Sequence, residues 1–287
     1  MSEPRCRICL GKLDGTSIDG YHRSCCRGLF SAETPPVFPH TWQDMNELAE
    51  RVARSRVSVP GVQPKLSVHL ERGGRGAPRL TLVGMEGDFV LKPPVPDYPE
   101  MPELEHVTLR MAEACGIEVA AHGLIALADG PWAFLSRRMD RAEGRKRHME
   151  DFCQLGDQMT DGKYRGSLER AGKIVLRYCD NALLDALRFF ERALFCFVTG
   201  NADMHLKNFS LLYDPGASVQ LSRAYDLVPS NLLLPQDTEE TALTVNGKKR
   251  RLRRRDFERL GRSLRLADKQ VANAFARLED RLPAARK

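Results

Sequence analysis

The chain has 287 residues, of which 42% are hydrophobic, so it can bury a sizeable core and exceeds the usual length of one compact domain. Its 44 basic and 38 acidic residues give a net charge of +6. The longest apolar runs are far too short to cross a membrane, and the first residues lack the apolar stretch of a signal peptide. These features argue against a membrane or secreted protein, and we expect a soluble, cytoplasmic protein with two lobes.

The first 35 residues predict a cap rich in cysteine and histidine. Four of the eight cysteines lie here and four are scattered singly, which is not the pattern of a small secreted disulfide framework. The stretch "CRICLGKLDGTSIDGYHRSCC" has the pair-plus-pair spacing of a tetrahedral zinc site, with the candidate ligands Cys6, Cys9, His22 and Cys25 or Cys26. A reduced, metal-free knuckle packed on the main body is the alternative.

Residues 36–140 predict a small sheet with helices. The apolar residues of "WQDMNELAERVAR" recur at a helical period, and "PELEHVTLRMAEACG" predicts a helix that begins near Pro102 and stops at Gly116. Short runs rich in valine, leucine and phenylalanine predict strands, namely "RVSVPGVQPKLSVHLE", "RLTLVG", "DFVLKPP", "HGLIALA" and "WAFLSRRMD".

Residues 141–287 predict a helix-rich lobe. From residue 148 onward the periodicity is helical, and "ALLDALRFFERALFCFVTG" is apolar on so many sides that we expect a central buried helix, ending at Gly200. The stretches "FSLLYD" and "QLSRAYDL" predict two short strands joined by a turn, and the tail is helical again. The fold class expected from this order is α+β, with a sheet-rich lobe followed by a helical one.

This order of elements suits phosphoryl transfer, in which a lysine and magnesium neutralise phosphates while an acid orients the attacking hydroxyl. Lys92, at the end of "DFVLK", would reach the phosphates from a rigid strand. Glu105, on the next helix, would hold that lysine through an ion pair. The alternative for Lys92 is an ordinary lysine at the end of a strand.

The stretch "GNADMHLKNF" directly follows the apolar helix. Asp203 and Asn208 have the spacing D-x-x-x-x-N, which lets an acid face the substrate hydroxyl while an amide oxygen coordinates magnesium. Asp226 would supply a second hard oxygen ligand. His205 would fix the shape of the loop, and Lys207 could neutralise charge that develops on the phosphoryl group. A turn pair that caps helix or hairpin ends is the alternative for the Asp and Asn residues.

Five segments, "SVPGVQPKLSV", "FVLKPP", "HMEDFCQ", "GNADMHLKNFSLLYD" and "YDLVPS", together resemble the HipA family of bacterial serine/threonine kinase toxins, in order from about residue 40 onward. The resemblance implies a two-lobed protein-kinase-like fold, with residues 36–140 as the N-lobe and 141–287 as the C-lobe, and ATP and Mg²⁺ as cofactors. We expect no large N-terminal subdomain before the first segment. The chain is therefore more similar to the short HipT type, in which a separate small protein supplies that part.

The resemblance also implies roles for individual residues. Asp203 would be the catalytic base, with Asn208 and Asp226 on magnesium and Lys92 on the phosphates. Three further groups of residues would bind ATP. A loop over the nucleotide comprises Pro60, Gly61, Val62, Gln63, Pro64 and Lys65. A hinge segment near the adenine comprises Arg137, Arg138 and Met139, and the residue before the metal-binding Asp is Tyr225.

Ser58 matches the serine that this family autophosphorylates to move the loop out and switch the kinase off. HipT-type loops can carry a second serine two residues later, and Pro60 stands there in this sequence. The loop has a single glycine and is no G-x-G-x-x-G cradle.

Two classes of function are therefore open. The first is an active kinase and toxin of a type II toxin–antitoxin system. The resemblance implies an aminoacyl-tRNA synthetase as its substrate. It also implies a small N-subdomain-like partner and a DNA-binding HipB-like antitoxin, so that the chain meets DNA only indirectly.

The second class is a catalytically silent regulator that binds nucleotide or nucleic acid through "KKRRLRRR" at 248–255, a run that can attract phosphates. An ordinary charged strand or turn before a helix near Asp256 is the simpler interpretation of that run. A small-molecule phosphotransferase is a third option, because fold does not fix substrate.

Overall fold

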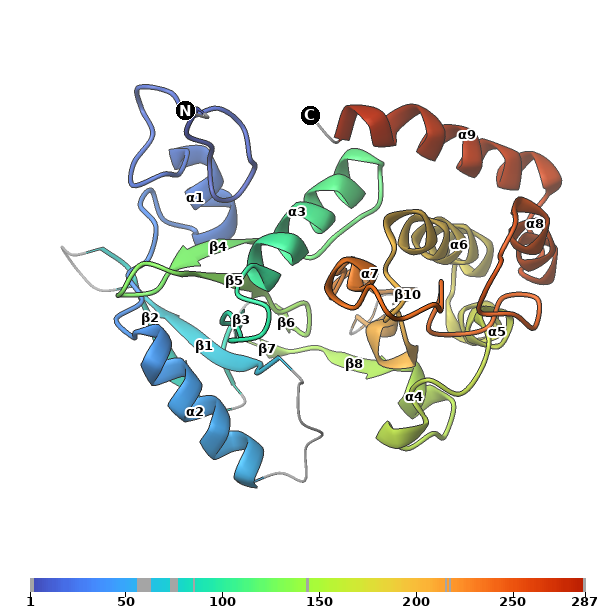
Figure 1. The fold of residues 1–287 in the computed structure, drawn as a ribbon, viewed down its shortest axis with the longest axis horizontal. Coiled ribbons are helices and arrows are strands. Elements are labelled where there is room, and N and C mark those ends of the chain that lie inside the picture. The colour runs from blue at the N-terminus through green and yellow to red at the C-terminus, as the bar shows by residue number, and fades with distance from the viewer. Residues whose placement is uncertain are drawn as a thin grey trace. The chain divides into compact units, whose positions relative to one another are not determined.

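The structure is a computed structural model that describes residues 3–55, 63–72, 77–84, 86–142, 145–214, 216 and 218–285. The chain divides into two compact units (Figure 1). Unit 1 comprises residues 1–107 and 120–138, and unit 2 comprises residues 108–119 and 139–287. Among the helices that the structure describes, none is long and apolar enough to cross a membrane.

Unit 1 is built on one five-stranded antiparallel sheet with the strand order β2-β1-β3-β5-β4. Its strands are β1 (Leu66–Glu71), β2 (Arg79–Val83), β3 (Phe89–Lys92), β4 (His122–Ala126) and β5 (Trp132–Arg137). Along β1, buried and more exposed residues alternate, as expected for a sheet with one covered face. A strand is therefore present in each of the five predicted runs, but β1 begins only at Leu66, after residues 63–65 of the first run, and residues 56–62 of that run lie outside the described part of the chain.

Helices and the N-terminal segment cover this sheet. They are α1 (Arg23–Phe30), α2 (Trp42–Ser55) and the first part of α3 (Met101–Ala114). Phe30 of α1 and Phe89 of β3 have ring centroids 6.3 Å apart, and both are buried. Cys6 and Tyr21 of the N-terminal segment belong to the same buried cluster. The segment thus contributes to the core of unit 1.

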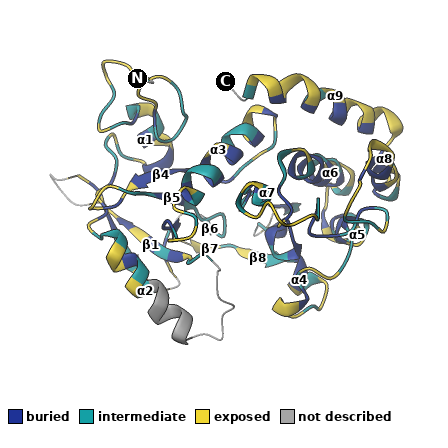
Figure 2. Cartoon of the chain, viewed as in Figure 1, coloured by how far each residue is buried: buried dark blue, intermediate teal, exposed yellow. Residues whose placement is uncertain are grey.

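Unit 2 is mainly helical. Its elements include α4 (Phe152–Leu155), α5 (Leu168–Tyr178), α6 (Ala182–Thr199), α7 (Ser230–Leu233), α8 (Arg254–Ser263), α9 (Asp268–Ala285) and the single turns η1 (Thr160–Gly162) and η2 (Leu206–Asn208). Figure 2 shows α6 largely buried and α9 exposed along one side. The sequence predicts α6 to be enclosed, but Leu183 and Leu184 are 55% and 50% exposed, so one side of its first turn faces solvent.

The strands of unit 2 differ from the prediction. The predicted pair becomes a three-stranded antiparallel sheet, β10-β9-β8, built from β8 (His148–Asp151), β9 (Ser210–Tyr213) and β10 (Val219–Leu221). Residues 148–151, predicted to begin a helical region, form the edge strand β8, because their backbone pairs with β9. Two short strands, β6 (Arg141–Ala142) and β7 (Arg145–Lys146), form a separate ladder.

Residues 108–119 belong to unit 2, although residues of unit 1 stand on both sides of them in the sequence. The backbone N–H of Ala224 donates to the carbonyl of Glu118 at 2.8 Å, and Val119 forms a parallel bridge with Ala224. The chain therefore passes between the units three times, after residues 107, 119 and 138.

Candidate functional site

The loop that carries the predicted catalytic residues follows α6. Gly200 ends this helix in the left-handed conformation with φ of 73°, which glycine adopts without steric cost. In the next residues, Asn201 Oδ1 accepts a hydrogen bond from the Asp203 N–H at 3.2 Å. The Asp203 carbonyl accepts from the His205 N–H at 2.8 Å and from Asn208 Nδ2 at 3.2 Å. The loop therefore folds around the backbone of Asp203.

The carboxylate of Asp203 is exposed, whereas most of the loop around it is buried. Tyr164 donates its hydroxyl to Asp203 Oδ1 at 2.6 Å. Burial and this hydrogen bond both raise the pKa of Tyr164, so its hydroxyl stays a donor at neutral pH. An exposed carboxylate with one fixed oxygen can accept a proton from a substrate hydroxyl.

His205 belongs to this loop. Its side chain is buried, and its ring meets that of Tyr164 edge-on with centroids 5.1 Å apart. Burial lowers the pKa of His205, against smaller opposing effects of the Asp203 and Asp226 carboxylates. The ring is therefore neutral at pH 7.

Asn208 and Asp226, the two predicted magnesium ligands, belong to two segments that are linked by hydrogen bonds of Tyr225. Tyr225 donates its hydroxyl to the Lys207 carbonyl at 2.9 Å and lies 2.6 Å from the Ser210 hydroxyl. Burial raises the pKa of Tyr225, which keeps this hydroxyl protonated. Its neighbour Asp226 has φ of 58°, an uncommon left-handed backbone that occurs more often at functional sites. Because Asn208 uses its amide nitrogen within the loop, its oxygen is the atom that would face a cation.

Lys207 is held by Asp151, a residue for which the sequence predicts no role. Its Nζ forms an ion pair with Asp151 Oδ2 at 2.8 Å. Asp151 also begins α4 with a capping box, in which its Oδ1 accepts from Gln154 N–H at 3.0 Å and Gln154 Oε1 accepts from the Asp151 N–H at 2.8 Å. The spacing Asp-x-x-Gln in "HMEDFCQ" could have revealed the cap. No sequence signal pointed to Tyr164.

Unit 1 contains the ion pair predicted from the sequence. Lys92 Nζ lies 2.7 Å from both carboxylate oxygens of Glu105, and both residues are buried. The Lys92 ammonium also lies 5.4 Å from the centroid of the Phe134 ring. Gln63 donates its amide to the carbonyl of Pro93 at 3.0 Å, which places the described end of the predicted nucleotide loop beside this strand.

The structure describes only some of the remaining residues predicted to bind ATP. Ser58, Pro60, Gly61 and Val62 lie outside the described residues. Pro64 is half-buried and Lys65 exposed.

The predicted hinge residues lie where the chain leaves unit 1, between Arg138 and Met139. Arg137 points its side chain elsewhere, because its guanidinium donates to the Leu29 carbonyl and packs against the ring of Phe89. Burial lowers the pKa of Arg137. The hydrogen bond to Leu29 indicates that this side chain stabilises unit 1.

The N-terminal zinc candidates come together. Ligand atoms of Cys6, Cys9, His22 and Cys25 all lie within 4.8 Å of one another. Cys26, the open alternative to Cys25, is buried in the core of unit 1.

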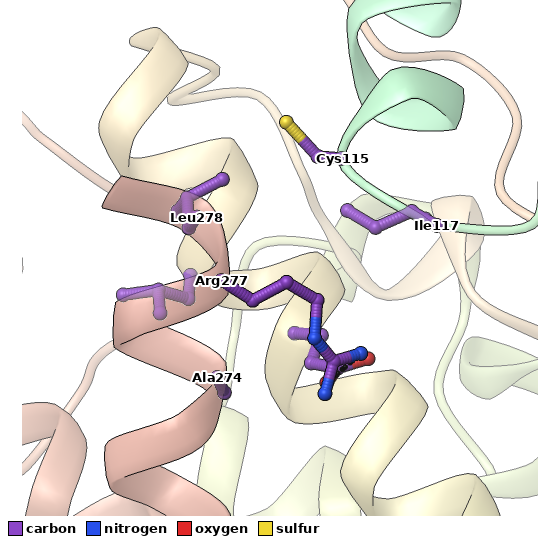
Figure 3. Close-up of a pocket in the computed structure, with 7 residues that line it drawn as sticks. Cys115, Ile117, Ala274, Arg277 and Leu278 are labelled. Carbon is purple, nitrogen blue, oxygen red and sulfur yellow. Dashed lines mark ion pairs between the residues drawn. The ribbon is translucent and has the colours of Figure 1, made fainter. Parts of the chain in front are cut away.

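Two recesses among the described residues are lined by residues of unit 2 alone. The one in Figure 3 lies between α6, α9 and the segment that follows α3, with Cys115, Leu194 and Leu278 in its wall, and its volume of about 10 Å³ suits a single water. A larger one of about 190 Å³ is lined by residues including Glu118, Arg188 and Arg223. None of the predicted catalytic or magnesium-binding residues lines either recess.

Comparison with known proteins identifies the family. Residues 57–286 match the HipA-like C-terminal domain family. The chain belongs to this family. The resemblance drawn from the sequence is thereby confirmed, while the HipT subtype stays a prediction.

Relatives of this HipA-like chain include named kinases. A protein of Haemophilus influenzae with the name "Putative kinase" is 28% identical over 241 residues, which are 78% of this chain and 67% of that protein. The "Serine/threonine-protein kinase toxin HipA" of Shewanella oneidensis is 28% identical over 196 residues, which are 61% of this chain and 43% of the toxin.

The fold of this HipA-like chain is shared with a solved structure. The complex of Shewanella oneidensis HipA with HipB and operator DNA aligns with a TM-score of 0.66 and 24% identity, over 80% of this chain and 57% of that one. The α+β, protein-kinase-like fold class predicted from the sequence is therefore confirmed. The chain spans little more than half of that solved chain and less than half of the toxin's length.

Proposed function

We propose that the chain is an ATP- and Mg²⁺-dependent serine/threonine protein kinase that acts as a toxin. The proposal rests on the loop 201–208. The side chains of Asn201 and Asn208 form hydrogen bonds with the backbone of Asp203, and the Asp203 carboxylate is left exposed. An acid presented in this way suits the role of a base that accepts a proton from a substrate hydroxyl.

In the proposed reaction, the substrate hydroxyl oxygen attacks the γ-phosphorus of ATP and ADP leaves as the bond to its bridging oxygen breaks. Asp203 accepts the hydroxyl proton while Tyr164 fixes one carboxylate oxygen. Lys92, held by Glu105, binds phosphate oxygens. Lys207 offsets charge on the transferred group.

The cofactor assignments rest on the donor atoms. Asn208 and Asp226 present an amide oxygen and a carboxylate, the hard donors that Mg²⁺ prefers. Both residues would hold the ion, whose charge would neutralise that of the phosphates. The remaining ATP contacts would come from residues 60–65, 137–139 and Tyr225.

The finer biology follows from kinship with HipA. We propose an aminoacyl-tRNA synthetase as the substrate class, autophosphorylation of Ser58 as the off-switch, and a HipB-like antitoxin with a small N-subdomain-like protein as partners. The solved HipA complex contains HipB and operator DNA, which supports this choice of partners.

The alternative, a silent regulator that works through residues 248–255, has less support. Lys248 pairs with Asp256 at 2.8 Å and Lys249 pairs with Glu239 at 2.9 Å, so carboxylates within the fold already neutralise part of the run. The run leads into α8, which begins at Arg254, in line with the simpler interpretation of a charged surface turn.

The decisive experiment compares phosphate transfer by the wild type, Asp203→Asn and the control Asp280→Asn, an exposed acid on α9. We expect Asp203→Asn to lose about 10²–10⁴-fold in transfer from labelled ATP, because a general base contributes about that factor. Its ATP affinity and thermal unfolding should match the wild type, and Asp280→Asn should transfer normally. Equal transfer by Asp203→Asn and the wild type would reject the assignment, and ATP binding without transfer by the wild type would favour the regulator.

A further inference from the structure

Three sulfurs and one imidazole nitrogen converge in residues 5–25, which we name the N-terminal knuckle. His22 Nδ1 is 3.3 Å from Cys9 Sγ and 3.9 Å from Cys25 Sγ, and with Cys6 Sγ all four ligand atoms lie within 4.8 Å of one another. Tetrahedral zinc with bonds of about 2.3 Å to sulfur and 2.0 Å to nitrogen keeps neighbouring ligand atoms about 3.5–3.8 Å apart. The four atoms are thus close to the spacing that zinc requires.

The hydrogen bond of the second ring nitrogen of His22 determines which nitrogen has a lone pair available for a metal. Nε2 lies 2.9 Å from the Lys12 carbonyl, and a carbonyl can only accept, so Nε2 carries the hydrogen. Nδ1 then directs its lone pair toward the sulfurs. Histidine ligands of metals have this arrangement, with the second nitrogen donating to an oxygen that fixes the tautomer and the ring.

Backbone N–H groups point at two of the sulfurs. Gly11 N–H donates to Cys9 Sγ at 3.4 Å, and His22 N–H donates to Cys6 Sγ at 3.4 Å. Such donors suit sulfurs that carry negative charge, the form in which cysteine binds metals. The knuckle therefore offers a shaped set of ligands and not only four residues that happen to be near.

We propose that the N-terminal knuckle binds one structural Zn²⁺ through Cys6, Cys9, His22 and Cys25. Four protein ligands close the coordination sphere and leave no position for a reacting water, which is the mark of a structural site. The ion would join the Cys-x-x-Cys turn to the first turn of α1, which carries Cys25. This role is independent of phosphoryl transfer in the proposed function.

The metal would stabilise the core of unit 1 and not the knuckle alone. In Figure 1 the N-terminal segment and α1 lie beside β4, and the Leu124 N–H donates to the Arg7 carbonyl at 2.9 Å. Tyr21 donates its hydroxyl to the Leu124 carbonyl at 2.7 Å. A Cβ on Gly123 would meet Ile8 at 2.9 Å, so the knuckle packs directly on the strand. Loss of the ion would release α1, and with it Phe30, from the sheet.

The test uses the full chain, expressed in zinc-supplemented medium and purified under reducing conditions. Zinc is measured by mass spectrometry in the wild type, Cys9→Ser, Cys25→Ser and the control Cys26→Ala. Cys26 neighbours Cys25 but lies in the apolar core, so its loss perturbs packing without removing a ligand. We expect about one zinc per chain in the wild type and Cys26→Ala, and at least a several-fold loss in both serine variants.

A second measurement covers the case in which the serine variants do not fold. Replacement of zinc by Co²⁺ in the wild type should give the thiolate charge-transfer absorption and the intense visible bands of tetrahedral cobalt. Chelation should lower the melting temperature of the wild type. A wild type that holds no zinc and takes up no cobalt would overturn the proposal, as would a folded Cys9→Ser variant with full zinc content.

Discussion

Lys92 and Lys207, the two lysines proposed to interact with phosphate groups, each form an ion pair with a carboxylate. The two ion pairs differ in how far they are exposed to water. In unit 1, the side chains of Lys92 and Glu105 are 5% and 1% exposed at a separation of 2.7 Å. In unit 2, those of Lys207 and Asp151 are 36% and 14% exposed at 2.8 Å. The two distances are nearly the same, but the free-energy cost of breaking each pair differs. A buried charge without its partner is costly, whereas water screens an accessible charge.

The largest effect is expected on breaking the buried pair. Glu105→Ala leaves the Lys92 ammonium without this carboxylate in a dry environment, which costs about 3–5 kcal/mol of folding free energy. Chemical denaturation, monitored by circular dichroism, measures this loss of folding free energy. The double variant Lys92→Met/Glu105→Leu should recover most of the stability and still transfer no phosphate. If the double variant is as unstable as Glu105→Ala, packing and not charge explains the loss.

A smaller effect is expected from the accessible pair. Asp151→Ala removes the ion pair with Lys207 and the cap of α4, and a lost cap costs about 1 kcal/mol. Asp151→Asn keeps the cap, because asparagine is an equally good N-cap residue, and removes only the charge. We expect Asn to restore stability in denaturant melts and to leave phosphate transfer reduced. Transfer at the wild-type rate in Asp151→Asn would show that the pair does not position Lys207.

The smallest effect concerns pH. Burial lowers the folded-state pKa of His205, so the unfolded chain takes up the proton first as the pH falls below about 6.5. Stability should therefore decline from that pH downward until the folded-state pKa is passed. His205→Gln should flatten this part of the stability–pH curve, while the control His148→Gln, at a largely exposed position, should not. An unchanged slope in His205→Gln would assign the decline to other groups.

What the sequence predicts well depends on local physics. The end of α6 at Gly200 and the loop behind it were predicted because helical periodicity and a helix-ending glycine are local signals. The knuckle was predicted from ligand spacing alone. The sequence could not choose between Cys25 and Cys26, because successive helical residues point about 100° apart and only the tertiary structure shows which one faces His22.

The misses have a common cause in long-range contacts. Residues 148–151 were not predicted as a strand, because four residues carry little periodicity and become a strand only by pairing with β9. Tyr164 reaches Asp203 from 39 positions away, and Asp151 reaches Lys207 from 56. No spacing rule connects residues so far apart, so the groups that position the catalytic side chains were visible only in the folded chain.

The way the backbone alternates between the units limits how the protein can be dissected. A fragment that ends at residue 138 would retain residues 108–119 but lose Ala224, the partner of Glu118, and the α9 residues that line the recess with Cys115 and Ile117. It would expose apolar surface and orphaned backbone groups on that insert. Separate expression of the halves therefore requires either replacement of the insert by a short polar linker or co-expression of both fragments.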